Sequence, residues 1–408
     1  MIESTAKKIT NQISGGVTAP AGFAAAGVAC GIKTSGLDLA LVVAAPPAKT
    51  AGIFTTNMVV AAPLIVTKEH LQQSDDTTTA VVVNSGCANA CTGPDGLAAA
   101  RTMAADAARV LNCRPEQVLV SSTGVIGQPL NSEKVREGIA AAAAQLSRGG
   151  HRNAAEAILT TDRSAKETAV RVTLAGGTIH IGGMAKGAGM IEPHMATMLG
   201  FLTTDADIAP TLLQRALVDA AADTFNAITV DGDTSTNDMV LLLASGESGV
   251  RVGEDDYREF VGAVRAVCRE LALAIVKGGE GATKLVDITV TGARSKADAR
   301  QGARAIANSP LVKTAIHGGD PNWGRLIAVA GRAGVDFNLA GASVRIGDVV
   351  LFTKETVFSD REPAAAAHLK GTEVAISVDL GVGGSEQATI WTCDFSAEYV
   401  RINADYRT

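Results

Sequence analysis

Short apolar runs that end in glycine- or asparagine-rich turns alternate along this chain with longer stretches of helical composition. Residues 79–84 and 117–120 are apolar runs of strand length, whereas residues 97–111 and 133–146 have the length and the alanine-rich composition of helices. Strands and helices that alternate in this way bury their apolar faces by packing against one another in layers. We therefore expect a mixed α/β protein.

The middle of the chain continues this pattern. Residues 170–182 form two alternating runs joined by a glycine-rich turn, which is typical of a β-hairpin. Residues 198–203 are expected to form a strand, and residues 211–225 and 257–276 to form helices.

A change of pattern follows the second of these helices. A glycine pair at positions 278–279 ends the helix, and beyond about residue 285 we expect a new set of strands. The chain is therefore predicted to contain a main α/β domain, residues 1–285, and a smaller C-terminal α/β domain, residues 286–408.

The composition excludes several classes of function. Apolar residues make up 47% of the chain, enough for a large core, whereas aromatic residues make up only 3% and leave little surface for stacking on bases. Acidic and basic residues are interspersed at a net charge of -6, without the basic run that binds nucleic acid. Residues 1–8 lack the apolar stretch of a signal peptide, and no segment holds about 18 consecutive apolar residues. We expect a cytoplasmic protein with no membrane span.

Neither of two possible metal-binding patterns is complete. Cys87 and Cys91 lie four residues apart but lack a second cysteine or histidine pair at a suitable spacing. Residues 231–242 look like part of a calcium loop, but the sixth position is Thr236 and the twelfth is Leu242, where glycine and glutamate are required. We expect no metal, and we interpret the acidic stretch as a turn near the site, rich in hydrogen bonds from side chains to the backbone.

The segment from Lys186 to Gly200 is the most unusual part of the sequence. A glycine-rich run leads to Pro193, and Thr197 then opens an apolar strand. Taken alone, an Ala–Thr peptide in such a place is an ordinary loop before a strand.

Together with several other short stretches, this segment resembles the ornithine acetyltransferase, or glutamate N-acetyltransferase, family. The shared order of the stretches along the whole chain carries the resemblance, because any one of them alone is weak. The matching stretches are residues 84–86, 88–93, 121–127, 160–162, 186–200, 231–238, 316–325 and 401–408. One local departure is Cys87, where many members of the family have asparagine.

The resemblance implies an activity and an assembly. The chain is expected to cleave itself between Ala196 and Thr197, giving fragments 1–196 and 197–408 that assemble as an α2β2 heterotetramer. The implied fold is a layered α/β sandwich of the ornithine acetyltransferase and self-processing aminopeptidase type, unlike a Rossmann sheet. The implied reaction is a ping-pong transfer of acetyl from N-acetylornithine to glutamate in arginine biosynthesis, without a metal or an organic cofactor.

The chemistry of Thr197 suits this expectation. Its hydroxyl can attack the carbonyl carbon of Ala196, so that the peptide becomes an ester that water then splits. Thr197 then begins a new chain, and its α-amino group, with an ordinary pKa near ~8, lies beside the hydroxyl that it must activate. One residue thus supplies both the nucleophile and the base.

The resemblance also assigns the remaining roles in the site. Thr123 and Gly124 are expected to stabilise the tetrahedral oxyanion, which needs hydrogen-bond donors. The expected substrate contacts are Thr160, Lys186, Thr197, Glu280, Asn403 and Thr408, with Thr161 as an alternative to its neighbour Thr160.

Two histidines are weaker candidates for the site. His194, two residues before the cleavage point, is a candidate helper in self-cleavage. His317 either lines the site or hydrogen-bonds its own glycine-rich loop.

Two rival interpretations and one open question stay beside this prediction. The first rival is a self-processing amidase or aminopeptidase of related fold, which passes the acyl group to water. The second is an uncleaved binding protein in which Thr197 is inert. The sequence leaves open whether acetyl-CoA also serves as an acetyl donor.

Overall fold

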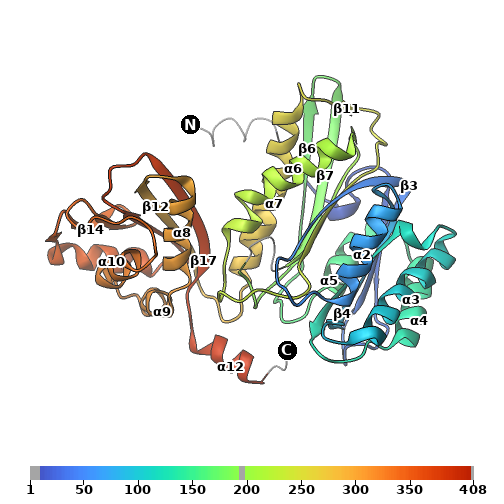
Figure 1. The fold of residues 1–408 in the computed structure, drawn as a ribbon, viewed down its shortest axis with the longest axis horizontal. Helices are drawn as coiled ribbons and strands as arrows, with labels where there is room; N and C mark the ends of the chain where they lie inside the picture. The colour runs from blue at the N-terminus through green and yellow to red at the C-terminus, as the bar shows by residue number, and fades with distance from the viewer. Residues whose placement is uncertain (1–9, 193–197, 406–408) are drawn as a thin grey trace.

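The computed structural model describes residues 10–192 and 198–405. Most of the strands belong to two sheets, one of nine strands and one of six. Figure 1 shows the two sheets with their helices side by side along the long axis of the molecule, the six-stranded sheet being formed by the C-terminal part of the chain.

The nine-stranded sheet is built from both sides of position 197. Its strands are β1 (Thr10–Ile13), β2 (Phe23–Val28), β3 (Leu39–Phe54), β4 (Thr77–Cys87), β5 (Val118–Val125), β6 (Lys166–Leu174), β7 (Gly177–Lys186), β8 (Leu199–Thr204) and β10 (Met239–Ala244). Their order is β1-β6-β7-β8-β10-β3-β4-β5, and β2 also pairs with β3. Strand β8, which follows position 197, lies inside the sheet, antiparallel to β7 and parallel to β10.

Strand β3 joins two halves of this sheet. Its first part pairs with β2 and β4, its second part pairs with β10, and the pairing with β4 shifts between Val43 and Ala48. One hydrophobic cluster contains side chains from both halves, such as Leu119 of β5 and Phe201 of β8. The two halves therefore form two β layers that share a core.

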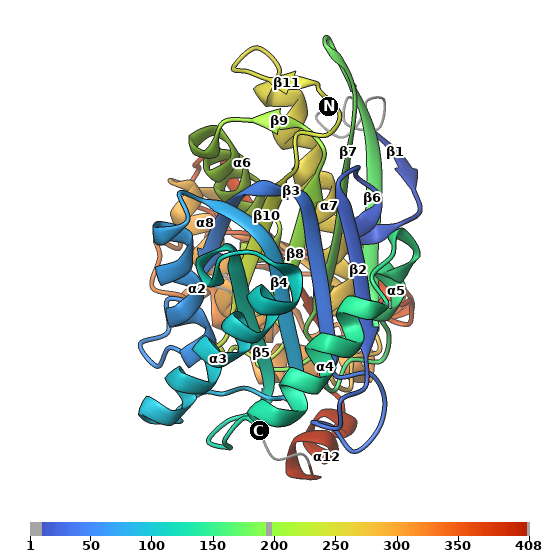
Figure 2. The same ribbon diagram turned by 90° about the vertical axis from the view of Figure 1, so that its right-hand side faces the viewer.

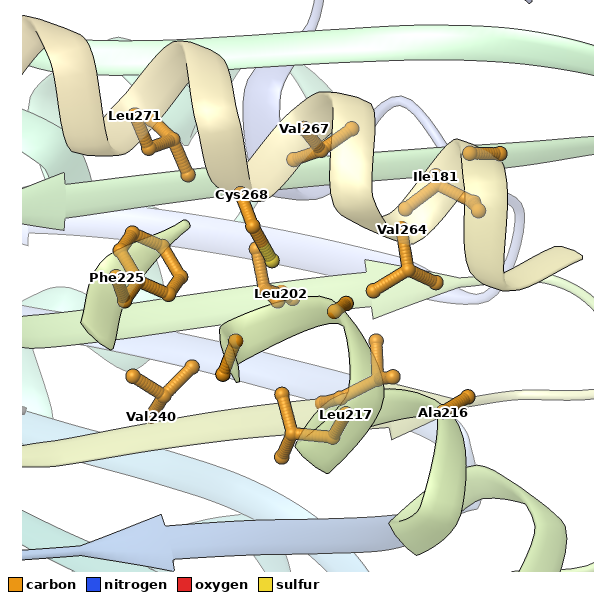
Figure 3. Packing of buried hydrophobic residues seen from close by; sticks show 14 of the residues in the cluster. Ile181, Leu202, Ala216, Leu217, Phe225, Val240, Val264, Val267, Cys268 and Leu271 are labelled. Atoms are coloured by element: carbon orange, nitrogen blue, oxygen red, sulfur yellow. The ribbon is translucent and has the colours of Figure 1, made fainter. Parts of the chain in front are cut away.

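Helices cover the outer faces of both β layers. They are α2 (Ala62–Gln73), α3 (Gly93–Leu111), α4 (Ser132–Ala144), α6 (Pro210–Ala222) and α7 (Tyr257–Lys277), and the short α5 (His151–Ala157) packs against β2 and β3. Figures 1 and 2 show α6 and α7 on one side of the β layers and α2, α3 and α4 on the other. Figure 3 shows how Phe225, Val264 and Leu271 meet Leu202 of β8 in the cluster between α7 and the sheet.

The six-stranded sheet and its helices form a separate hydrophobic cluster. Its strands are β12 (Leu285–Ala293), β13 (Ser343–Ile346), β14 (Val349–Thr353), β15 (Thr356–Val357), β16 (Glu373–Asp379) and β17 (Glu386–Cys393), in the order β15-β14-β13-β16-β12-β17. The helices of this part are α8 (Lys296–Ala307), α9 (Pro310–Gly318), α10 (Trp323–Gly331), α11 (Glu362–Leu369) and the C-terminal α12 (Ala397–Asp405). The two-residue strands β9 (Asp207–Ile208) and β11 (Arg251–Val252) pair with each other.

Contacts link the six-stranded sheet to the larger part. The backbone N–H of Thr229 donates to the carbonyl of Trp391 on β17 at 2.9 Å. Trp391 packs against the cluster of the six-stranded sheet and against the cluster between α7 and the nine-stranded sheet. Among the described residues, no helix is long and apolar enough to cross a membrane.

The expected mixed α/β class with layers and without a Rossmann sheet is confirmed. The strands expected at 79–84 and 198–203 correspond to β4 and β8, and the expected long helices correspond to α3, α4, α6 and α7. Beyond residue 285 the expectation of strands was incomplete, because α8 to α11 also lie there. The second sheet begins at Leu285, and the division of the chain into two domains at this point stays a prediction.

The packing around β8 predicts a large stability effect at Leu202. This side chain is 0% exposed inside the cluster, so Leu202→Ala should lower the free energy of unfolding by about 2–5 kcal/mol. Leu339→Ala removes the same atoms from a side chain that is 42% exposed and should change the stability by less than about 0.5 kcal/mol. Urea unfolding of both variants followed by circular dichroism tests this difference, and equal losses would contradict it.

Candidate active site

One pocket brings together residues that are far apart in the sequence. It lies where β5 and β7 end and β8 begins, beside the C-terminal helix α12. Its lining includes Thr123, Gly124, Thr160, Thr161, Lys186, Met198, Asp231, Asn237, Glu280, Tyr399 and Asn403.

Thr123 and Gly124 reach the pocket through an irregularity in the pairing of β4 and β5. Cys87 of β4 pairs with both Thr123 and Val125, so the ladder bulges where Gly124 lies. Gly124 has a φ of +132°, and a Cβ atom there would lie 2.3 Å from the carbonyl carbon of Gly86. Only glycine fits, so the close approach of the two strands requires glycine at position 124.

Asn237 supports the same loop from the other half of the sheet. Its side-chain amide donates to the carbonyl of Ala88 at 2.7 Å and to the carbonyl of Ser122 at 2.9 Å. The hydroxyl of Ser122 donates to Oδ1 of Asn84 at 2.6 Å. Ser122 immediately precedes Thr123, and these buried bonds hold the backbone that leads to it.

A buried carboxylate organises one end of the pocket. Asp162 accepts a hydrogen bond from Nζ of Lys166 at 2.5 Å and one from the backbone N–H of Gly187 at 2.7 Å. Its other oxygen lies 3.7 Å from Nζ of Lys186, which also donates to the hydroxyl of Thr160 at 2.9 Å.

The charges of this cluster do not cancel. Burial alone would raise the pKa of Asp162, but the charges of Lys186 and Lys166, with the hydrogen bonds from Lys166 and from the N–H of Gly187, lower it to about 2. Asp162 therefore stays ionised at any physiological pH. Two ammonium groups face one carboxylate, which leaves this end of the pocket positive and suited to a substrate carboxylate.

Glu280 forms part of a negatively charged end of the pocket, beside α12. Its carboxylate is buried and accepts a hydrogen bond from the side-chain amide of Asn403 on α12 at 2.8 Å. Its backbone N–H donates to the carbonyl of Ala188 at 2.8 Å. A Cβ atom on Gly189 would lie 2.4 Å from Oε2 of Glu280, so the chain passes Glu280 closely only because this residue is glycine.

Asp231 adds a second carboxylate to this end. It accepts hydrogen bonds from the backbone N–H groups of Met190 and Ile191 and one from the hydroxyl of Tyr399 at 3.2 Å. Burial raises the pKa of Asp231, although the N–H bonds oppose the shift. Burial and the charge of Asp231 also raise the pKa of Tyr399 well above its ordinary value, so its hydroxyl remains a donor.

The pocket is therefore polar and is lined by groups of both charges. A small molecule that carries both a carboxylate and an amine matches these charges. The hydroxyl of Thr123 and the backbone of Gly124 also line this pocket, and such groups suit a reaction that develops negative charge on an oxygen.

Most of the site residues expected from the sequence share this pocket. Both Thr160 and Thr161 line it, so the choice between them stays open. Ala196, Thr197, His194 and Thr408 lie outside the described residues.

His317 occupies a different place. It lies on α9, and its Nδ1 is 2.6 Å from Oδ2 of Asp394. Neither expected role is seen, because His317 is not among the described residues that line the pocket and its hydrogen-bond partner Asp394 is 77 residues away rather than in its own loop.

The residues of the pocket region that were not assigned from the sequence include four with contacts described above: Asp162, Asp231, Asn237 and Tyr399. Three of them belong to stretches that the resemblance had already marked, residues 160–162 and 231–238. An acidic or amide side chain within such a stretch could have marked these three residues as candidates for the site. For Tyr399 the sequence offers only a polar, aromatic C-terminal stretch, which has no specific meaning.

Two solved structures resemble parts of this chain. The arginine biosynthesis bifunctional protein ArgJ of Bacillus halodurans has 41% sequence identity and a TM-score of 0.44, and the match covers 46% of this chain and 98% of that one. The ornithine acetyltransferase of Mycobacterium tuberculosis, solved in complex with ornithine, has 43% identity and a TM-score of 0.43, with coverage of 46% and 100%.

Curated relatives match over nearly the full length. The arginine biosynthesis bifunctional protein ArgJ of Symbiobacterium thermophilum is 48% identical over 402 residues, which cover 97% of this chain and 99% of the relative. The protein of the same name from Chlorobaculum tepidum is 47% identical over 401 residues, with coverage of 98% and 99%. The model of the ArgJ family matches residues 24–408. This chain therefore belongs to the ArgJ family.

Proposed function

We propose that this chain is a self-cleaving glutamate N-acetyltransferase of arginine biosynthesis, which moves acetyl from N-acetylornithine to glutamate. The observation that carries the proposal is the shared pocket, in which Thr123, Gly124, Lys186 and Glu280 lie together with Met198, the residue after Thr197. Relatives named for arginine biosynthesis and a similar ornithine acetyltransferase support the same activity.

Self-cleavage makes the nucleophile. The hydroxyl of Thr197 attacks the carbonyl carbon of Ala196, the C–N bond breaks, and the peptide becomes an ester with a free α-amino group. Water hydrolyses the ester, leaving a carboxylate on Ala196 and an amine and a hydroxyl on Thr197. The amine is then available as the base that takes the proton of this hydroxyl.

Acetyl transfer uses the same hydroxyl twice. The hydroxyl of Thr197 attacks the acetyl carbonyl of N-acetylornithine, ornithine leaves with a proton on its α-amine, and an acetyl ester remains. The α-amine of glutamate then attacks this ester and regenerates the hydroxyl. Thr123 and Gly124 stabilise the oxyanion of each tetrahedral intermediate.

The charged groups of the pocket support the proposal that one site binds both amino acids. Lys186, with Thr160, binds the α-carboxylate that both substrates carry, and Glu280 binds the δ-ammonium of ornithine. Glutamate has a carboxylate in place of that ammonium. The side-chain amide of Asn403, which donates to Glu280, supplies a donor for it at the same end.

The proposal extends to the donor, the assembly and the location. The name of the relatives, bifunctional protein, favours a second donor, and we propose acetyl-CoA for this role. From the family resemblance we propose an α2β2 heterotetramer, in which Asn403 and the C-terminal Thr408 contact substrate, and a cytoplasmic location.

The acetylated fragment is the direct test of the proposal. The purified protein should separate on a denaturing gel into two fragments, one of 196 residues that begins at Met1 and one of 212 residues whose N-terminus, by sequencing, is Thr197. Incubation with N-acetylornithine alone should add one acetyl group to that fragment, and glutamate should remove it. Intact-mass spectrometry measures both steps.

Matched variants complete this experiment. Thr197→Ala lacks the hydroxyl and should remain one inactive chain, whereas Thr197→Ser keeps a hydroxyl and should cleave. Acetyl-CoA in place of N-acetylornithine tests the second donor. Release of free acetate without glutamate at the same rate as with it would favour the amidase, and an uncleaved wild-type chain would favour the binding protein.

Loss of an oxyanion donor should affect turnover more than binding. Thr123→Ala should lower kcat by about 10²–10³-fold with little change in KM. Thr314→Ala, the same change at an exposed residue of α9, is the control and should leave both constants unchanged. A lower melting temperature with normal kcat in the folded fraction of Thr123→Ala would indicate a structural role instead.

Removing the charge of Glu280 should discriminate between donors. Glu280→Gln should raise KM for N-acetylornithine far more than for an N-acetyl amino acid without a side-chain amine, because breaking a buried charge pair costs about 2–5 kcal/mol. KM for glutamate should not rise. Steady-state kinetics with the two donors measure the difference.

The control for this variant is Glu373→Gln, which removes an exposed carboxylate on β16 that pairs with Lys277. It should leave all constants unchanged. Equal losses of Glu280→Gln with both donors would show that Glu280 supports the fold or the nucleophile rather than the amine.

A further inference from the structure

The segment that leads to the cleavage site is held along its length by residues from elsewhere in the chain. The N–H of Gly187 donates to Asp162 at 2.7 Å, and the carbonyl of Ala188 accepts from the N–H of Glu280 at 2.8 Å. Glu192, the last described residue before the cleavage site, pairs with Arg304 at 2.7 Å.

Asp231 holds the middle of this segment. The N–H of Met190 donates to its Oδ2 at 2.7 Å, and the N–H of Ile191 donates to its Oδ1 at 2.8 Å. Two successive N–H groups that point at one anion form a nest, an arrangement in which the backbone itself binds negative charge.

The backbone at this nest is strained. Met190 has a φ of +56°, in the left-handed region that residues other than glycine, asparagine and aspartate rarely adopt. Such a conformation costs on the order of 1 kcal/mol and persists only where surrounding contacts hold it. The carboxylate of Asp231 accepts hydrogen bonds from the N–H groups of both Met190 and Ile191, and so holds the backbone on both sides of this peptide.

Residues next to Asp231 hold the following carbonyl group. The carbonyl of Ile191 accepts hydrogen bonds from the N–H of Val230 at 2.8 Å and from the hydroxyl of Thr229 at 3.0 Å. Both the N–H and the carbonyl of Ile191 are thus bound by residues 229–231. The direction in which the chain leaves Ile191 is therefore set by these three residues.

We propose that Asp231 is a positioning residue for self-cleavage, whose carboxylate holds Met190 and Ile191 in the strained conformation from which the chain enters the cleavage site. The inference rests on the proposed function, because it assumes cleavage before Thr197. Attack of a hydroxyl on a peptide requires the two groups to be aligned, and a displacement of about 1 Å can cost ~10²-fold in rate. Asp231 acts on this alignment through the backbone and takes no part in the bond changes.

The test compares cleavage rates of freshly made chains. Wild type and Asp231→Asn are translated in a cell-free system, quenched at intervals and resolved on a denaturing gel. Asparagine has one acceptor oxygen, and its amide group would meet an N–H donor of the nest. Cleavage should slow by about tenfold or more, the scale of losing a hydrogen bond to a charged group.

A second variant separates positioning from a general loss of structure. Glycine adopts positive φ without strain, so Met190→Gly combined with Asp231→Asn should recover much of the cleavage rate. Asp255→Asn removes the same charge from an exposed residue outside the pocket lining and should cleave as fast as wild type. Melting temperatures of Asp231→Asn and its parent, both carrying Thr197→Ala so that neither is cleaved, report the effect on folding.

The outcomes distinguish this inference from the proposed function. If the wild-type chain is not cleaved, the proposed function fails, and the inference fails with it. If the wild type is cleaved and Asp231→Asn is equally fast, only the inference is overturned. It is also overturned if Asp231→Asn is slow and the glycine variant is just as slow, because strain at Met190 is then not what Asp231 controls.

Discussion

The burial of one carboxylate between two lysines determines much of the pocket. The side chain of Asp162 is 0% exposed, and an ion in such a place is tolerated only when it is paired and hydrogen-bonded. Removing one partner of a buried ion pair costs about 3–5 kcal/mol, because the remaining charge has no counterpart. Since the same carboxylate binds the N–H of Gly187 and lies beside Lys186, it fixes both the positive end of the pocket and the start of the segment toward the cleavage site.

The sequence predicted the fold best where one face of an element is apolar. Helices α3, α6 and α7 have such faces. Helix α8 also has an apolar face, but it was missed because charged residues such as Lys296, Asp298 and Arg300 make the stretch polar overall. Strand β3 was missed for another reason. It runs over sixteen residues with two consecutive prolines in its middle, which suggest a loop, and it continues only because its pairing shifts there.

In the site, too, some features were predictable from the sequence and others were not. Its candidate nucleophile and substrate contacts were predicted by resemblance of short stretches, and the turn at 231–238 does contain the expected hydrogen bonds from side chains to the backbone, such as that of Asn237 to Ala88. The partners of those bonds were not predictable, because Asn237 and Ala88 are 149 residues apart and meet only in the folded sheet. Supporting contacts of this kind depend on the whole topology, while the reacting groups depend on local chemistry.

The strand order has a consequence for how the two products would stay together. Strands β8 and β10 follow position 197, and they lie between β7 and β3, which precede it. A cut between residues 196 and 197 would break the chain and leave every ladder of the sheet intact. The two fragments would then form one cooperative unit, in which the strands of each fragment pair with strands of the other. Dilution alone would not separate them, because dissociation would require the central sheet to unfold.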